Sequence, residues 1–194
     1  MISLQQMSTD LTAAQSLKQY DEVIDRCRHL FIEKTKDYGT AWRILRLPSL
    51  TDQIFIKARR IRSIQQKGVQ RIADGIDQEF VAIINYGIMS LIQLDLNGSD
   101  EIELPLEQVS ELYDSSVEAT RELFANKNHD YGEVWRDMRV SSMTDLILMK
   151  ILRIKQIEDN AGVTRVSEGV RGNYQDIINY AIFCMIILTE NEQA

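Results

Sequence analysis

The sequence predicts an all-α protein formed by tandem duplication of one three-helix unit. Residues 38–46 read YGTAWRILR and residues 131–139 read YGEVWRDMR, so Tyr131 follows its counterpart Tyr38 by 93 positions. The same offset relates matching residues along most of the chain and becomes 94 after one inserted residue near Asn160. A repeat of this length is longer than the unit of a solenoid and indicates duplication of a whole small fold.

Turn-forming residues separate the two copies. Asn97 and Gly98 open a short acidic segment that reaches Pro105 and lacks helical periodicity. We therefore expect three parts in the chain: a first repeat at residues 11–96, a linker at 97–106 and a second repeat at 107–190.

Each repeat is expected to contain three helices, at residues 11–35, 50–66 and 76–95 in the first copy and at 107–128, 143–159 and 171–190 in the second. The third helix has the broadest apolar face, with apolar residues three and four positions apart around Ile84 and Ile178. One three-helix unit cannot cover such a face by itself. We therefore expect the two third helices to pack together in a pseudo-two-fold helical bundle. Gly87 and Ala181 would let their backbones approach closely.

Local signals predict where the second helix of each repeat begins and ends. Ser49 and Ser142 are each followed three residues later by an aspartate, which is the spacing of a capping box. Gly68 and Gly162 are suited to the left-handed conformation that ends a helix.

Composition limits the classes of partner. The net charge is −7 and the pI is about 4.9, which opposes general binding to nucleic-acid backbones. The longest apolar run, residues 182–188, is too short to span a membrane, and no secretory signal peptide is expected. Cys27 and Cys184 form no CxxC pair, so we expect buried free thiols, as in cytoplasmic proteins.

The sequence contains no GxxxxGK, HExxH or GxSxG motif and no zinc-type set of cysteines. Its two histidines, His29 and His129, do not match between the repeats. Candidate chemistry therefore comes from residues that both copies share.

The most informative shared segment combines lysine, aspartate, tryptophan and arginine, as Lys34, Asp37, Trp42 and Arg43 and as Lys127, Asp130, Trp135 and Arg136. The lysines and arginines would bind phosphate, the tryptophans would stack on a nucleobase, and the aspartates would hold Mg²⁺. The alternative is structural: the aromatic side chains fill the core and Asp37 caps the turn before Gly39. Gly39 and Gly132 are predicted to have positive φ.

Two further sets of charges are open to both a functional and a structural interpretation. A lysine and an arginine three residues apart share one face of each second helix, as Lys57 and Arg60 and as Lys150 and Arg153. They form either a phosphate clamp or a solvated face. Asp74, Glu168 and Asp176 belong to the segments that lead into and form the third helices, and acids four or eight residues apart on a helix share a face that can hold Mg²⁺. Glu168 and Asp176 are therefore candidate metal ligands together with Asp37 and Asp130.

These motifs resemble the nucleotide-modification-associated domain 1 family of bacteria and phages. The resemblance covers both copies through K-x-x-D-Y-G, the following W-R, D-x-x-x-x-K-x-x-R-I, and a third helix with N-Y. It implies a link to nucleotide or DNA-base modification. The last helix is also similar to the all-α nucleoside triphosphate pyrophosphohydrolases of the MazG and dimeric dUTPase group, which bind Mg²⁺ through paired acids. The sequence departs from that pattern at Gln78, Ala82 and Gly172, where acids would stand, and at Lys57 and Arg60.

The leading hypothesis is a cytoplasmic nucleotide-associated helical protein. Its activity would be Mg²⁺-dependent hydrolysis of nucleoside phosphates or a role in nucleotide or DNA-base modification. The alternative is a non-catalytic helical module for oligomerisation or partner binding. The expected ligand is a nucleotide with Mg²⁺ as cofactor, no membrane partner is expected, and whether the chain forms a homo-oligomer is left open.

Overall fold

The computed structural model describes residues 4–68, 75–164 and 168–193, and within these ranges every regular element is helical. The first repeat forms α1 (Leu4–Tyr38), η1 (Ala41–Ile44), α2 (Leu47–Lys67) and α3 (Ile76–Asp95). The second repeat forms α4 (Leu106–Tyr131), η2 (Val134–Asp137), α5 (Val140–Asp159) and α6 (Val170–Gln193). The predicted all-α class and the three long helices of each repeat are confirmed. Helix α1 begins at Leu4 rather than near residue 11.

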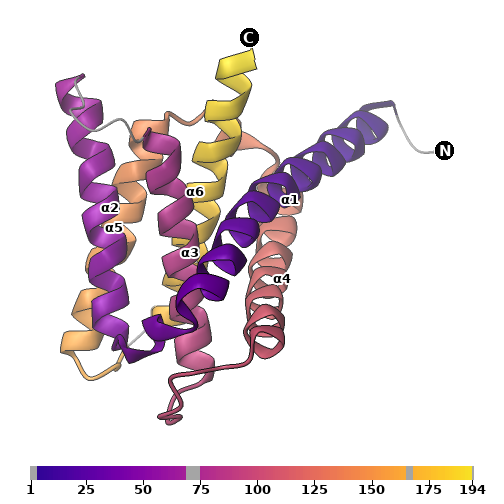
Figure 1. Ribbon diagram of the computed structural model, residues 1–194. Coiled ribbons are helices and arrows are strands. Elements are labelled where there is room, and N and C mark those ends of the chain that lie inside the picture. The colour runs from indigo at the N-terminus through magenta and orange to yellow at the C-terminus, as the bar shows by residue number, and fades with distance from the viewer. Residues whose placement is uncertain (1–3, 69–74, 165–167, 194) are drawn as a thin grey trace.

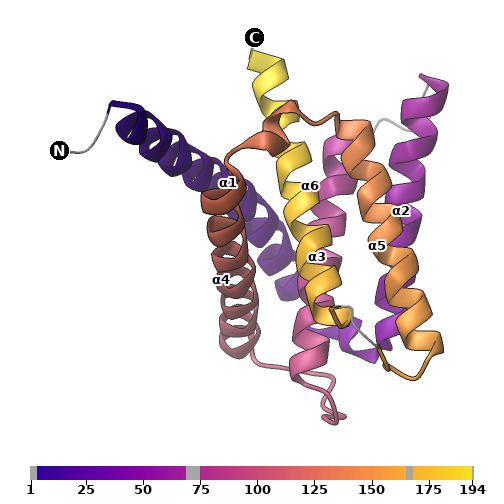
Figure 2. The same cartoon turned by 180° about the vertical axis from the view of Figure 1, so that it is seen from behind.

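The six long helices lie in three layers of two, and each layer takes one helix from each repeat (Figures 1 and 2). Helices α3 and α6 form the central layer and contact each other along their apolar faces. Helices α2 and α5 cover one side of this layer, and α1 and α4 cover the other. The expectation that the two third helices share one core is confirmed.

Two buried hydrogen bonds cross between the repeats in a reciprocal pattern. The Tyr20 hydroxyl donates to Asn179 Oδ1 at 3.1 Å, and the Tyr113 hydroxyl donates to Asn85 Oδ1 at 2.9 Å. Tyr20 and Tyr113 occupy matching positions in the two copies, as do Asn85 and Asn179. A pseudo-two-fold relation between the copies would produce such an exchange, because each first helix then contacts the third helix of the other repeat.

Ion pairs between the repeats follow the same reciprocal pattern. Four of them form two matched sets: Arg28 with Asp114 and Arg121 with Asp21, and Lys155 with Asp52 and Arg62 with Asp145. All four lie at least partly in solvent, where an ion pair contributes about 0–1 kcal/mol. Each of them therefore adds little to the stability of this arrangement.

The central layer is packed most closely where α3 meets α6. Ile84 and Ile178 are fully or almost fully buried. A Cβ added at Gly87 would lie 2.7 Å from Ile178 Cγ1, which is closer than real Cβ contacts allow. The glycine at this position therefore permits the approach of the two helices, as the sequence suggested.

The predicted capping boxes are wrong. Helix α2 begins at Leu47 and α5 begins at Val140, and neither N-cap residue makes a side-chain capping bond. Ser49 and Ser142 lie inside the first turn, so the aspartates that follow them are free to reach across to the other repeat. Pro48 suits the early start of α2, because proline lacks the N–H that would be unpaired in the first turn.

The predicted left-handed glycines are confirmed in part. Gly68 is the C-cap of α2, with φ 63°. Gly162 also has positive φ, 80°, but it lies two residues after Asn160, which is the C-cap.

None of the helices in the described ranges has an apolar stretch that would cross a bilayer.

Substitutions at the contact of α3 and α6 test this packing. Truncation of Ile84 or Ile178 to alanine is expected to lower the free energy of unfolding by about 2–5 kcal/mol, because each leaves a cavity. Gly87→Ala is expected to cost about 1–3 kcal/mol by overpacking. In the Ile178→Ala background the new methyl group enters the cavity, so Gly87→Ala should cost less. Urea denaturation of the double-mutant cycle measures this coupling, and additive costs would contradict the contact.

Cys27 and Cys184 are buried free thiols, as predicted. Burial raises the pKa of the Cys27 thiol to about 12 and raises the pKa of Cys184 as well. The thiol of an unfolded chain has a pKa of about 8.5. Above that pH the folded protein therefore keeps thiol protons that the unfolded chain has lost.

The free energy of unfolding should therefore be constant with respect to these thiols below about pH 8 and fall as the pH rises. The slope should approach about 1.4 kcal/mol per pH unit for each thiol. Denaturation between pH 8 and 10 measures it, and a variant with both cysteines replaced by alanine is the control. An identical pH dependence in that variant would show that the thiols do not contribute.

Candidate functional site

A cavity of about 440 Å³ opens in the second repeat between α4, η2, α5 and α6. Its wall contains four residues of the predicted site, together with groups that the sequence did not single out. The predicted residues are Lys127, Trp135, Glu168 and Asp176, and the additional polar and aromatic ones include Phe124, Asn128, Lys150, Asn179, Tyr180 and Phe183.

Helical spacing explains why these side chains converge. On α4 the cavity is lined at positions 124, 127, 128 and 131, and on α6 at positions 176, 179, 180 and 183. Steps of three and four residues place side chains on one face of a helix. Lys127 of α4 meets Asp176 of α6, and Phe124 of α4 meets Phe183 of α6. The cavity therefore has a charged end and an aromatic end.

The charged end is centred on the buried carboxylate of Asp176. Its Oδ1 accepts a hydrogen bond from Lys127 Nζ at 2.7 Å, and its Oδ2 accepts one from Lys150 Nζ at 2.5 Å. Lys150 is buried, whereas the side chain of Lys127 is 45% exposed. Burial lowers the pKa of Lys127, but the hydrogen bond and charge of Asp176 outweigh it, so the net shift is upward. Lys127 is therefore a cation at neutral pH.

The aromatic end is formed by stacked and edge-on rings. Trp135 stacks on Phe183 with ring centroids 4.5 Å apart, and Phe124 lies 5.4 Å from Phe183. The indole N–H of Trp135 donates to Asn128 Oδ1 at 3.0 Å. Trp135 thus lines the cavity, but most of its ring is buried in the core, and stacking of the tryptophan on a nucleobase stays a prediction.

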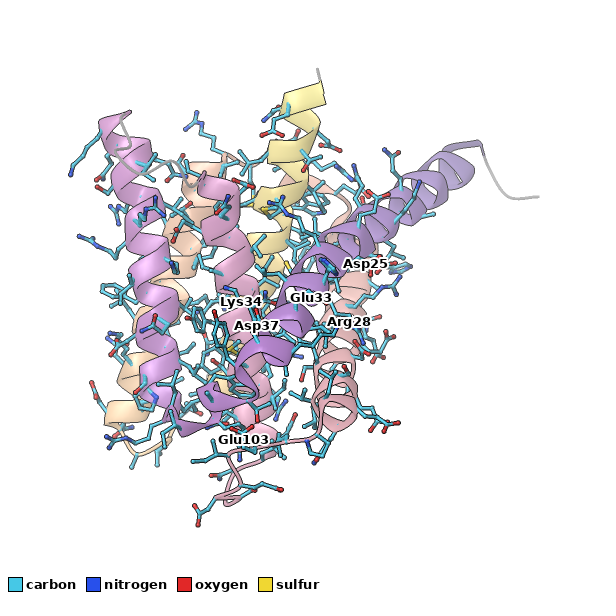
Figure 3. All side chains as sticks on the ribbon, viewed as in Figure 1. Asp25, Arg28, Glu33, Lys34, Asp37 and Glu103 are labelled. Carbon is cyan, nitrogen blue, oxygen red and sulfur yellow. The ribbon has the colours of Figure 1, made fainter. Side chains whose placement is uncertain are left out.

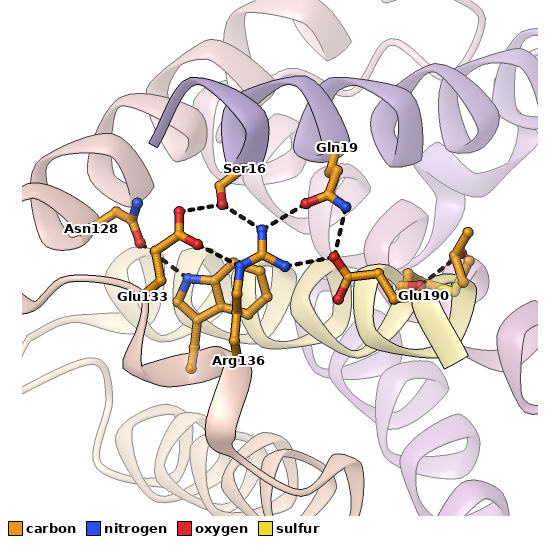
Figure 4. A network of polar contacts seen from close by, with 9 residues as sticks. Ser16, Gln19, Asn128, Glu133, Arg136 and Glu190 are labelled. Atoms are coloured by element: carbon orange, nitrogen blue, oxygen red, sulfur yellow. Dashed lines mark hydrogen bonds and ion pairs between the residues drawn. The ribbon is translucent and has the colours of Figure 1, made fainter. Parts of the chain in front are cut away.

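The arginine of the W-R motif has a structural role in the second repeat. Arg136 lies over the Trp135 ring at 4.3 Å and donates to Glu133 and Glu190 and to the side-chain oxygens of Ser16 and Gln19 (Figure 4). Its guanidinium joins α1, η2 and α6. Arg136 does not line the cavity, so its predicted role in binding phosphate has no support from its position.

Arg43 occupies the matching position in the first repeat and holds the linker. Its guanidinium donates to the carbonyl oxygens of Ser99 and Glu101 and to the side chain of Gln93. Thr40 adds two bonds, donating to Ile102 O and accepting from Leu104 N. Arg43 is buried and uses its donors within the chain, so it too is a clamp rather than a phosphate ligand.

The aspartates of the D-Y-G segments lie outside the cavity. Asp37 is exposed near the end of α1, together with Lys34 (Figure 3). Asp130 is also exposed and contacts only His129 among the described residues. Within the described ranges no three acidic, histidine or cysteine side chains are close enough to share a metal ion. Asp37 and Asp130 therefore do not join Glu168 and Asp176, and Asp74 lies outside the described residues.

Gly39 and Gly132 have φ of 61° and 67°, so the predicted positive φ of both D-Y-G turns is confirmed. The two turns differ in their surroundings. A Cβ at Gly39 would lie 2.5 Å from the Glu103 carboxylate of the linker, whereas one at Gly132 would meet no atom within 4 Å. The second-repeat turn therefore borders open space at the edge of the cavity.

The first repeat arranges its buried charges differently. Glu79 is buried and accepts from Arg60, and its second oxygen lies 3.3 Å from Lys57 Nζ. Lys57 matches Lys150, but the position of Asp176 is taken by Ala82, one helical turn after Glu79. Lys57 and Arg60, predicted as a phosphate clamp, thus form ion pairs with Glu79. The alternative prediction of a solvated helix face does not hold for Lys150 in the second repeat, because Lys150 is buried.

Sequence reasoning did not single out Asn128, Tyr180 and Phe183. It noted Asn179 only as part of a shared N-Y pair and Lys150 only as part of a charged helix face. The i, i+3, i+4 spacing of the lining positions on α4 and α6 was the available signal. Apolar and polar residues alternate on these faces, so the faces did not stand out from ordinary amphipathic helices.

Comparison with known families shows to which group of proteins the chain belongs. The model of nucleotide modification associated domain 1 matches residues 34–94 and 127–188. The chain belongs to this family. No curated protein and no solved structure matches the chain. Each nucleotide modification associated domain begins at the lysine of the D-Y-G motif and extends through the third helix, and the second one contains most of the cavity wall. The likeness to MazG-type enzymes remains a prediction.

Removal of the Asp176 charge tests the arrangement of the charged end. Asp176→Asn is expected to lower the free energy of unfolding by about 3–5 kcal/mol, because it leaves the buried ammonium of Lys150 without its carboxylate. Asp37→Asn is the control, and at this exposed site the change should be within about 0.5 kcal/mol. Chemical denaturation measures both. A second change, Lys150→Met, should recover part of the loss in Asp176→Asn, and no recovery would contradict the pairing.

Proposed function

We propose that the second repeat binds a nucleotide in the cavity between α4 and α6. The observation that carries the proposal is the convergence of two lysines and a stacked aromatic wall in one cavity of the second nucleotide modification associated domain. Lysine ammonium groups bind phosphate as point charges, and aromatic rings offer a stacking surface for a base. A volume of about 440 Å³ is within the range of small-molecule sites.

The charged end suits a phosphate group that approaches from solvent. Lys127 is the more accessible of the two lysines, and its ammonium is held at the cavity by Asp176. On binding, this ammonium can turn from the carboxylate to a phosphate oxygen and exchange one charge-assisted hydrogen bond for another. Lys150 would remain paired with Asp176 and keep that carboxylate from repelling the ligand.

Mg²⁺ is proposed as a second component of the site. Glu168 and Asp176 both line the cavity, and Mg²⁺ in proteins is commonly bound through one or two carboxylates together with substrate phosphates. The donor set therefore fits the ion. The charges of Lys127 and Lys150 balance those of the two carboxylates, so a phosphate alone would add uncompensated negative charge to a chain of net charge −7. When bound, Mg²⁺ would neutralise that charge.

The lysines of the two D-Y-G motifs provide a matched test. Lys127→Ala should weaken binding of nucleoside mono- and triphosphates by about ten- to a hundredfold, as expected for loss of a hydrogen bond to a charged group. Lys34→Ala removes the matching lysine of the first repeat, which is exposed, and should leave the affinity unchanged. Calorimetric titration measures both. Equal affinity of the Lys127 variant and the parent protein would refute the site.

The Mg²⁺ component has its own variant. Nucleotide binding to the parent protein is expected to tighten when Mg²⁺ is added, and Glu168→Gln should reduce that gain while leaving binding without Mg²⁺ little changed. Thermal-shift and calorimetric titrations with and without the ion separate the two effects, because a ligand that binds only the folded state raises its melting temperature. The same Mg²⁺ gain in the Glu168 variant would show that this carboxylate does not hold the ion.

A further inference from the structure

Two buried asparagines in the cavity wall leave their NH₂ groups available to a ligand. Asn128 and Asn179 are 9% and 5% exposed, and both line the cavity. Asn128 Oδ1 accepts from the Trp135 indole, and Asn179 Oδ1 accepts from the Tyr20 hydroxyl. In the part of the chain that the structure describes, neither NH₂ group has a protein partner, and neither is among the enclosed unpaired polar atoms.

Bonding chemistry fixes the orientation of both amides. An indole N–H can only donate, so the oxygen of Asn128 must face Trp135 and its NH₂ group must face away. A tyrosine hydroxyl can donate or accept, but the matching amide in the first repeat resolves this choice. Asn85 Nδ2 donates to the carbonyl oxygen of Cys27 at 3.1 Å, which places its oxygen toward Tyr113. The reciprocal contact of Tyr20 with Asn179 has the same polarity.

The available NH₂ groups distinguish the second repeat from the first. Asn85 uses both ends of its amide within the protein, whereas Asn179 uses only its oxygen. The position of Asn128 is occupied by Thr35 in the first repeat, and its hydroxyl donates to Phe31 O. As a result the buried Trp42 indole N–H has no hydrogen-bond partner among the residues that the structure describes, although its counterpart Trp135 has one.

At the two amides the cavity therefore offers donors to a ligand rather than acceptors. The oxygens of both asparagines are already engaged, and each oxygen of Asp176 accepts from a lysine. A ligand that presents a donor to either NH₂ group would leave a nearly buried polar group unpaired, which disfavours its binding. The ligand surface that meets these amides must carry acceptor atoms.

The place of the amides indicates which part of the ligand they meet. Along the lining face of α6, Asn179 lies between Asp176 at the charged end and Phe183 at the aromatic end. Asn128 is bonded directly to the stacked Trp135. A nucleotide with its phosphate at Lys127 would bring its base, rather than its phosphate, to these two amides.

We propose that Asn128 and Asn179 together recognise two acceptors on the nucleobase, at least one of them a carbonyl oxygen, so that the cavity selects bases with an exocyclic oxygen over adenine. Adenine carries its exocyclic NH₂ donor beside the N1 and N7 acceptors, so one of the two amides would be left without a partner. Tyr20 of the first repeat acts as a positioning residue, because its hydroxyl holds Asn179 with the NH₂ group toward the ligand. This inference rests on the proposed nucleotide site and adds the class of base that the site accepts.

Binding of UMP, IMP and AMP tests the selection. The tighter of UMP and IMP is expected to bind at least about tenfold more tightly than AMP, since one unpaired buried donor costs about 1.4 kcal/mol or more. Asn179→Leu and Asn128→Thr should each weaken the preferred nucleotide by about tenfold while changing the binding of pyrophosphate by less than about twofold. Asn128→Thr introduces the residue that the first repeat carries at this position. AMP binding as tight as that of UMP and IMP would overturn the inference.

Two matched variants control for the fold. Asn85→Leu removes the matching amide of the first repeat, so it should lower the melting temperature like Asn179→Leu but leave nucleotide affinity unchanged. Tyr20→Phe should reduce the preference over AMP, because the Asn179 amide is then free to rotate, whereas Tyr113→Phe should not. An equal effect of the two tyrosine variants on that preference would overturn the positioning role.

The outcomes also separate this inference from the site itself. If Lys127→Ala weakens binding while Asn179→Leu and Asn128→Thr do not, the nucleotide site stands and base recognition by the amides fails. If the asparagine variants weaken pyrophosphate as strongly as the preferred nucleotide, the amides contact phosphate and the inference fails. If none of the nucleotides binds to the parent protein, the proposed function fails and this inference with it.

Discussion

The contact between α3 and α6 is the constraint on which the rest of the structure depends. Each of these helices carries an apolar face that is too broad for one three-helix unit to cover, and each buries it against the other. Gly87 allows the backbones to approach until the side chain of Ile178 fills the space where a Cβ would lie. Burial of apolar area is the main favourable term in folding, so neither repeat has a complete core without its partner.

This mutual dependence explains why contacts between the repeats are reciprocal. Tyr20 and Tyr113 each reach the asparagine of the other repeat, and such buried hydroxyls require an acceptor. In the first repeat the exchange completes a closed set of hydrogen bonds. In the second repeat the same exchange orients Asn179 at the wall of the cavity. A contact that serves assembly in one copy therefore also shapes the wall of a cavity in the other.

Divergence between the copies is clearest in their buried charges. Lys150 is buried and Lys57 is partly buried, and a charge that is withdrawn from water needs an opposite charge beside it. The first repeat supplies Glu79 and the second supplies Asp176, one helical turn further along. The shift turns the carboxylate toward Lys127 and places charged groups at the cavity. The arginines of the W-R motif diverged in a related way, since Arg43 holds the linker and Arg136 joins α1 to α6.

The sequence by itself determined the helical class, the duplication, the three helices of each repeat and the shared core of the third helices, because these depend on periodicity and offset along the chain. Four of its candidate residues, Lys127, Trp135, Glu168 and Asp176, line one cavity. Only the tertiary structure decided that Lys150, Asn128 and Asn179 join them and that Asp37, Asp130, Arg43 and Arg136 do not. Matching residues in two repeats look equivalent in sequence, but each side chain bonds to whatever acceptor or carboxylate the surrounding helices bring within reach. That proximity is set by the packing of the layers, and the order of residues along the chain does not contain it.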